Sequence, residues 1–141
     1  MIFAVDFDGT CVEHRYPEIG KSIGAESVLK CLVDNGHKII LYTMRSHKPY
    51  EGRDLLQEAV DWFKDNGIEL FGVNENPSQK EWTDSPKPYA NYYIDDSALG
   101  CPLTIKSLGT RPYVDWEKLR DTFENAGIIS IGCGKGKTVE K

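Results

Sequence analysis

Short apolar runs alternate along the chain with amphipathic stretches, and glycine or polar residues separate them. The apolar runs expected to form strands lie at 2–7, 38–43, 69–73, 92–95 and 103–106. Apolar side chains recur at helical spacing over 25–35, 51–66 and 116–126, and Asp115 is placed to cap the last of these helices. Strands that alternate with helices predict a βαβ protein. We therefore expect an α/β, Rossmann-like three-layer fold with a mostly parallel central sheet.

The length of 141 residues fits one domain. We assign residues 1–130 to a single catalytic domain, in which the polar loop 11–21 forms a small flap. Residues 131–141 are rich in glycine and lysine, which predicts a flexible C-terminal tail.

Composition narrows the possible partners. The chain carries 17 basic and 22 acidic residues, a net charge of −5, which argues against general binding to nucleic acid or to a membrane surface. No apolar run approaches the about 20 residues of a membrane span, so a cytoplasmic location is expected. The four cysteines form no C-x-x-C pair, which favours reduced thiols over a zinc site or a disulfide framework. They are Cys11, Cys31, Cys101 and Cys133.

Acidic pairs follow two of the predicted strands. Asp6 and Asp8 come at the end of the first strand, and Asp95 and Asp96 come at the end of the fourth. Ligands of such sheets bind at the carboxyl ends of the strands, where these carboxylates converge and repel one another. A hard cation with oxygen ligands relieves that repulsion, so the sequence predicts a Mg²⁺ site.

Candidate donors for an anion lie at the same edge of the predicted sheet. Thr43 ends the second strand and Arg45 follows it, offering a hydroxyl and a guanidinium. Lys80 and Lys87 lie between the third and fourth strands. Either lysine balances charge if it reaches the crevice, and either is equally an ordinary solvated surface lysine.

Four motifs now stand in order: an apolar strand with DFDGT, then KIILYT ending in Thr43, then a lysine, then YYIDD. This set resembles the haloacid dehalogenase (HAD) superfamily of aspartate-nucleophile phosphohydrolases. The resemblance covers residues 2–96. It implies a HAD-like fold and a Mg²⁺-dependent phosphohydrolase that acts on a small phosphomonoester through an aspartyl-phosphate.

The resemblance also implies residue roles. Asp6 is the expected nucleophile, and Asp8 is the expected general acid and then general base. Thr43 is expected to bind a phosphoryl oxygen, and Lys87, or alternatively Lys80, to stabilise the developing charge. The metal is expected to be held by Asp6, Asp95, Asp96 and the backbone carbonyl of Asp8. The expected substrate-binding residues are Gly9, Thr10, Arg45 and His14.

The spacing between motifs leaves no room for a cap domain. Only 32 residues separate Thr10 from Thr43, and 17 separate Asn74 from Tyr92, so a capless form is expected. His14, Arg15 and Tyr16 on the flap are candidate contacts for the leaving group, and equally candidate exposed loop residues. An open site suits a large substrate, or one enclosed by a second subunit, so a homo-oligomer stays open.

Other functions remain in view. One is a catalytically silent HAD-like binding or scaffold protein. Another is a polynucleotide-end phosphatase, which the acidic charge disfavours. A phosphoaccepting receiver domain is disfavoured more strongly, because the third strand ends in Val73-Asn74-Glu75 and offers no acceptor aspartate.

Overall fold

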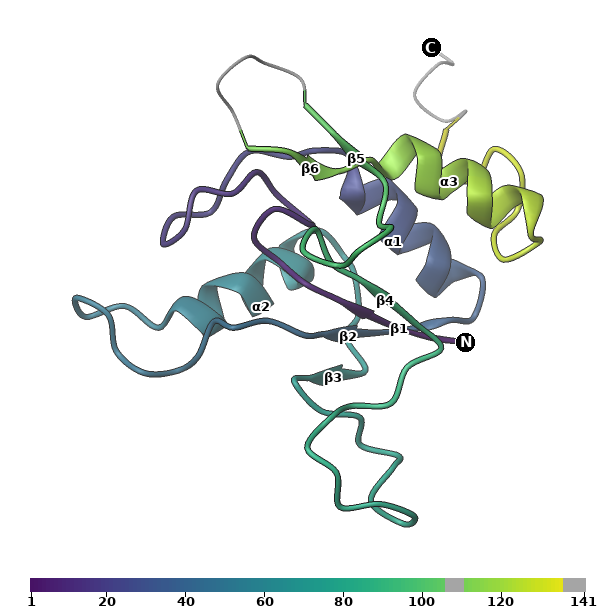
Figure 1. The fold of residues 1–141 in the computed structure, drawn as a ribbon. Coiled ribbons are helices and arrows are strands. Elements are labelled where there is room, and N and C mark those ends of the chain that lie inside the picture. Colours follow the sequence, from purple (N-terminus) through teal and green to yellow (C-terminus); the bar gives the residue numbers. More distant parts are fainter. Residues whose placement is uncertain (106–110, 136–141) are drawn as a thin grey trace.

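The computed structural model describes residues 1–105 and 111–135. Its main sheet has the order β3-β2-β1-β4, and every pairing in it is parallel. The strands are β1 (Ile2–Val5), β2 (Lys38–Leu41), β3 (Gly72–Val73) and β4 (Tyr92–Ile94). The helices are α1 (Ala25–Asp34), α2 (Leu55–Asp65) and α3 (Trp116–Asn125). The predicted α/β class with a parallel sheet is confirmed (Figure 1).

The two faces of the sheet are covered differently. Phe3 and Val5 of β1 belong to the large core that the helices complete. Ala4 of β1 and Ile40 of β2 point the opposite way and form a small separate cluster with Ala90. All three helices lie on one side of the sheet, and the long connection from β3 to β4 lies on the other (Figure 1). The expectation of helices in two outer layers is therefore wrong for the described residues.

Segment 74–91 takes the place of the missing helical layer. Two buried amide side chains hold it together in place of helical hydrogen bonds. Asn76 donates to the carbonyl of Tyr89 at 2.9 Å, while Gln79 donates to the carbonyl of Lys87 at 3.0 Å and accepts from the Tyr89 N–H at 2.7 Å. The segment thus packs against the sheet without regular secondary structure.

Helix α2 begins four residues later than the sequence predicts. Glu51 and Gly52 adopt φ values of 51° and 79°, which no right-handed helix contains. Asp54 then caps α2, because its side chain accepts the N–H of Gln57. Asp115 caps α3 in the same way through the N–H of Lys118, as predicted. None of the helices in the described part of the chain is long and apolar enough to cross a lipid bilayer.

A second, two-stranded sheet follows β4. Strand β5 (Leu103–Thr104) pairs antiparallel with β6 (Tyr113–Val114). The predicted strand 103–106 therefore exists in its first half, while Lys106 lies outside the described residues. Strand β6 was not predicted, because two residues are too few to show a period.

Cys31 of α1 and Cys133 form a disulfide, with Cα atoms 6.0 Å apart. The prediction of reduced thiols is wrong for this pair, and the chain separation of 102 residues explains why spacing rules gave no signal. Arg120 of α3 also donates to the carbonyl of Cys133. Residues 131–135 are thus fastened to both helices rather than flexible, and 136–141 lie outside the described residues.

Reducing the disulfide is expected to lower the free energy of unfolding by about 2–4 kcal/mol, because the bond closes a long loop in the unfolded chain. Chemical denaturation with and without dithiothreitol measures the change. The Cys31→Ser variant is expected to match the reduced protein and to ignore the reductant. Cys101→Ser is the control, since Cys101 is a free thiol. Equal stability in both buffers for the unsubstituted protein would contradict the prediction.

Candidate active site

Three carboxylates meet at the carboxyl edge of the main sheet. Asp6 follows β1, and its N–H donates to the carbonyl of Ile94 at 2.9 Å, so the ends of β1 and β4 stay paired. Asp95 and Asp96 follow β4 directly. One oxygen from each of the three carboxylates lies within 4.8 Å of the others. The structure brings together three of the four acidic residues that the sequence placed at two strand ends.

The cluster consists of three carboxylates and contains no basic side chain. Burial first, and then the neighbouring charges of Asp95 and Asp96, raise the pKa of Asp6 to about 7. Oxygen atoms crowded in this way are the ligands that Mg²⁺ prefers. The donor set therefore fits a hard divalent cation.

The hydroxyl of Thr10 contacts two of the three carboxylates. Its side chain is fully buried, and its hydroxyl lies 3.2 Å from Asp6 Oδ2 and 3.0 Å from Asp96 Oδ1. The same hydroxyl oxygen accepts the N–H of Asp96 at 3.0 Å. Trp116 of α3 fixes the turn by donating its indole N–H to the Thr10 carbonyl at 2.7 Å. Thr10, which was expected to bind substrate, is buried in this structure, and its contacts are with the acidic residues that it orients.

Gly9 allows the turn and the close approach of Asp96. Its φ is 81°, a left-handed conformation that L side chains rarely adopt. A Cβ atom at this position would lie 2.6 Å from Asp96 Oδ2. Gly9 is thus required by the geometry of the acidic cluster, and its expected part in binding substrate stays a prediction.

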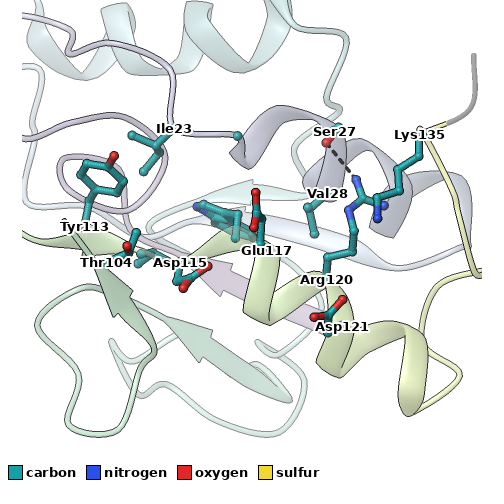
Figure 2. A pocket seen from close by; sticks show the side chains of 14 residues that line it. Ile23, Ser27, Val28, Thr104, Tyr113, Asp115, Glu117, Arg120, Asp121 and Lys135 are labelled. Atoms are coloured by element: carbon teal, nitrogen blue, oxygen red, sulfur yellow. Dashed lines mark hydrogen bonds between the residues drawn. The ribbon is translucent and has the colours of Figure 1, made fainter. Parts of the chain in front are cut away.

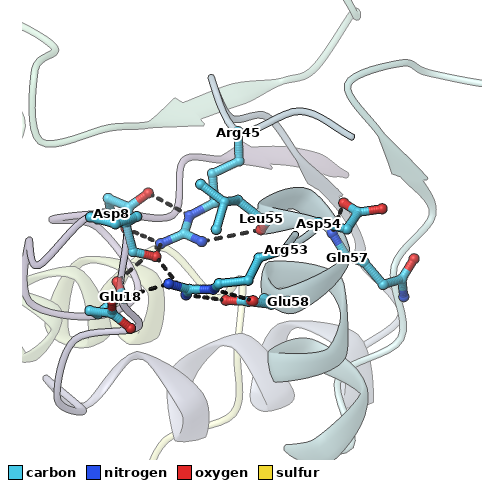
Figure 3. Close-up of polar contacts among 9 residues, drawn as sticks. Asp8, Glu18, Arg45, Arg53, Asp54, Leu55, Gln57 and Glu58 are labelled. Atoms are coloured by element: carbon cyan, nitrogen blue, oxygen red, sulfur yellow. Dashed lines mark hydrogen bonds and ion pairs between the residues drawn. The ribbon is translucent and has the colours of Figure 1, made fainter. Parts of the chain in front are cut away.

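Asp8 is not part of the acidic cluster and pairs with Arg45. The guanidinium of Arg45 donates to both oxygens of Asp8 at 2.8 Å (Figure 3). The Arg45 side chain is 1% exposed and that of Asp8 is 12% exposed. Arg45 is among the residues that line the cavity at this site, but its guanidinium is enclosed by protein and engaged by Asp8, so its role in binding substrate stays a prediction.

A small cavity of about 250 Å³ joins these groups. Asp6, Asp8 and Asp96 line it together with Thr43, as do His14 and Tyr16 of the flap. Arg15 of the flap does not line this cavity and instead pairs with Glu13 at 3.2 Å. Arg111, which sequence reasoning missed, also lines the cavity and lies 4.0 Å from Asp96 Oδ2. No strand or motif marks Arg111, so the sequence held no signal for it.

Thr43 lies at the cavity with its backbone held by a second residue that was missed. Asn74, directly after β3, accepts the N–H of Thr43 at 2.8 Å. The Thr43 hydroxyl accepts the N–H of Arg45 at 3.1 Å, which leaves its proton to donate into the cavity. The position of Asn74 after a strand was the available signal.

Neither candidate lysine lines this cavity. Lys87 is exposed, and its ammonium lies over the ring of Tyr93, 5.2 Å from the centroid. Lys80 is also exposed and lines a different hollow of about 580 Å³ within segment 74–88. The role of Lys87, or alternatively Lys80, at the phosphoryl group stays a prediction.

A larger cavity of about 470 Å³ lies between α1, α3 and the β5–β6 hairpin (Figure 2). Its walls carry acidic and basic side chains together, among them Asp115, Glu117 and Arg120. The guanidinium of Arg120 is occupied by Ser27 at 2.9 Å and by the carbonyl of Cys133. This cavity contains none of the sequence-predicted site residues.

The fold and the site define an α/β protein with an acidic centre at the carboxyl edge of a parallel sheet. The sequence matches no family model and no curated protein. Among solved structures, a conserved protein coded by a locus of Bacteroides thetaiotaomicron is similar, with 34% sequence identity and a TM-score of 0.67. The match covers 89% of this chain and 91% of that one. The chain therefore belongs to the same family as that conserved Bacteroides protein.

Proposed function

We propose that the protein is a Mg²⁺-dependent phosphohydrolase of the HAD superfamily, which cleaves a small phosphomonoester through an aspartyl-phosphate. The observation that carries the proposal is the convergence of Asp6, Asp95 and Asp96 within 4.8 Å. Asp6 and Asp96 line a cavity together with Asp8 and Thr43. A nucleophilic carboxylate, a second carboxylate for proton transfer and a hydroxyl donor are the groups that this chemistry needs.

In the first step, an Asp6 oxygen attacks phosphorus while the bond from phosphorus to the leaving oxygen breaks. Asp8 gives its proton to that oxygen, so an alcohol departs and the aspartyl-phosphate remains. In the second step, Asp8 takes a proton from water, and the water oxygen attacks phosphorus and breaks its bond to Asp6. Inorganic phosphate leaves and both carboxyls return to their starting states.

The remaining groups bind and orient. The Thr43 hydroxyl donates to a phosphoryl oxygen, and Arg111 at the cavity supplies positive charge from the other side. Asp6, Asp95 and Asp96 would hold Mg²⁺, which when bound supplies charge neutralisation for the carboxylates and the phosphoryl group.

The size of the cavity bears on the substrate. Its 250 Å³ falls below the ~300–1,000 Å³ typical of small-molecule sites. A phosphoryl group and a small adjoining part fill it, and the rest of a longer substrate would extend past Tyr16 and His14 into solvent.

The test is phosphate release from sugar phosphates, nucleotides, and 3′- or 5′-phosphorylated oligonucleotides. Each is assayed with Mg²⁺ and with a chelator, and Asp6→Asn serves as the blank. We expect metal-dependent release by the unsubstituted protein alone. If no compound is cleaved, binding of beryllofluoride with Mg²⁺ decides the matter, since failure to form this mimic of the aspartyl-phosphate would favour a silent binding protein.

Mg²⁺ is expected to raise the melting temperature, because it binds the folded state and relieves the repulsion among the carboxylates. Asp95→Asn is expected to raise the Mg²⁺ concentration needed for half of that shift by at least about tenfold. Thermal melts over a Mg²⁺ series measure it, with Asp65→Asn on the exposed end of α2 as control. An unchanged titration in Asp95→Asn would leave Asp6 and Asp96 as the metal ligands.

A further inference from the structure

Arg45 occupies an unusual position for a charged side chain beside a catalytic cavity. The residue is 2% exposed, and its guanidinium lies close to two aromatic rings. The central carbon is 5.1 Å from the centroid of Phe7 and 5.2 Å from that of Tyr16 on the flap. Both rings therefore contribute to the burial of the guanidinium.

Each guanidinium nitrogen of Arg45 donates to the protein. Nε and Nη2 grip the two oxygens of Asp8 at 2.8 Å (Figure 3). Nη1 donates to the carbonyl of Leu55 at the start of α2, at 3.1 Å. Nη2 also reaches the flap carbonyls of Pro17 and Glu18, at 3.3 and 3.1 Å. One side chain thus joins Asp8, the flap and α2.

This pairing fixes the carboxyl of Asp8 in one plane. A two-point grip by a guanidinium stops rotation of the carboxyl, and it uses one lone pair on each oxygen. The other lone pairs remain for the cavity, which Asp8 lines. The backbone N–H of Arg45 is held by the Thr43 hydroxyl, so the group that binds phosphate and the group that orients Asp8 share one turn.

We propose that Arg45 is a positioning residue that holds Asp8 in the orientation needed to protonate the leaving oxygen, and that it ties this orientation to the flap. The inference rests on the proposed function, in which Asp8 is the general acid. Cleavage of a substrate whose leaving group departs without a proton needs no oriented general acid, so it depends little on Arg45. Cleavage of a substrate with a poor leaving group requires protonation of the leaving oxygen, so it depends strongly on Arg45.

Arg53 provides a matched control. It fastens the same flap, donating to the Pro17 carbonyl at 3.3 Å and pairing with Glu18 at 3.1 Å, and its other partner is Glu58. It makes no contact with Asp8 among the interactions of the described residues. Loss of Arg53 therefore weakens the flap attachment without releasing the general acid.

The experiment compares kcat/KM for glycerol 2-phosphate, which has a poor leaving group, with kcat/KM for 4-nitrophenyl phosphate, which has a good one. The ratio of the two values is measured for the unsubstituted protein, Arg45→Met, Arg45→Lys and Arg53→Met. It does not depend on the fraction of folded enzyme, because both substrates meet the same preparation. Poorly folding variants therefore remain informative.

In Arg45→Met the ratio is expected to fall at least about tenfold, since general acid catalysis contributes about 10²–10⁴-fold. Arg45→Lys is expected to lie between, because lysine keeps the charge but lacks the two-point grip. Arg53→Met is expected to stay within about twofold of the unsubstituted protein. An unchanged ratio in both Arg45 variants would overturn the inference and leave the phosphohydrolase proposal standing. Absence of turnover by the unsubstituted protein on both probes, together with failure to bind beryllofluoride with Mg²⁺, would overturn both proposals.

Discussion

Asp6→Asn is expected to reduce phosphate release by at least about 10⁴-fold, because the amide cannot attack phosphorus. The same variant is expected to be more stable than the unsubstituted protein in the absence of metal. The shape of the side chain is retained, and the buried negative charge that Asp95 and Asp96 repel is gone. Loss of activity together with a gain in stability separates removal of a nucleophile from disruption of the fold.

The gain in stability has a defined pH dependence. The pKa of Asp6 is raised from 3.8 to about 7, so the folded state binds this proton more tightly than the unfolded chain does. Stability from this group is present at acid pH, and it is lost as the pH rises from about 4 to about 7. Above that range Asp6→Asn is expected to exceed the unsubstituted protein by about 1–2 kcal/mol.

Denaturant unfolding of both proteins in chelator, from pH 4 to pH 8, measures this difference. Asp65→Asn at the exposed end of α2 serves as the control and is expected to track the unsubstituted protein. A constant difference between Asp6→Asn and the unsubstituted protein over this range would contradict the electrostatic explanation. Appreciable turnover by Asp6→Asn would contradict the covalent mechanism.

Gly9→Ala is the second change with a large expected effect. The added methyl would meet Asp96 Oδ2 at 2.6 Å and Asp96 Cγ at 2.8 Å, and the φ of 81° strains any L side chain. Asp96 cannot easily withdraw, since Thr10 holds both its carboxylate and its N–H. We expect a loss of about 2–5 kcal/mol in the free energy of unfolding, from backbone strain and overpacking together.

Gly36→Ala isolates the steric part of this loss. Gly36 has a similar φ of 87°, but a Cβ there meets nothing within 4 Å. It is expected to lose only the about 1–2 kcal/mol of a left-handed residue, and to keep the full Mg²⁺-dependent rise in melting temperature. In Gly9→Ala that rise is expected to vanish. Equal losses in the two variants, with the Mg²⁺ response intact in both, would show that the close approach to Asp96 is unimportant.

The acidic cluster could be predicted because a parallel sheet brings the carboxyl ends of its strands to one edge. Asp6 and Asp95 needed only the assignment of two strands, because the carboxyl ends of parallel strands meet at one edge. The second outer layer could not be predicted in the same way. Segment 74–91 replaces a helix through the side-chain amides of Asn76 and Gln79, which leave no periodic pattern in the sequence.

Arg45 shows what sequence reasoning lacks at the site. Its place two residues after Thr43 indicated the right edge of the sheet, but not the direction of its side chain. That direction depends on carbonyls of the flap and of Leu55, and the predicted helix start at residue 51 placed α2 incorrectly. The lysine stayed open for a related reason, since the path of an irregular segment decides where Lys87 lies.

Strand β1 is hydrogen-bonded on both sides, and its residues Phe3, Ala4 and Val5 are almost fully buried. Amides in such a strand exchange with deuterium only when the whole domain opens, whereas those of the two-residue edge strand β3 exchange through smaller local openings. The carboxylate of Asp6 follows directly after β1 and is thus carried by the slowest-exchanging part of the molecule. Local opening of the edge strand β3 is therefore expected to be much more frequent than any opening that displaces Asp6.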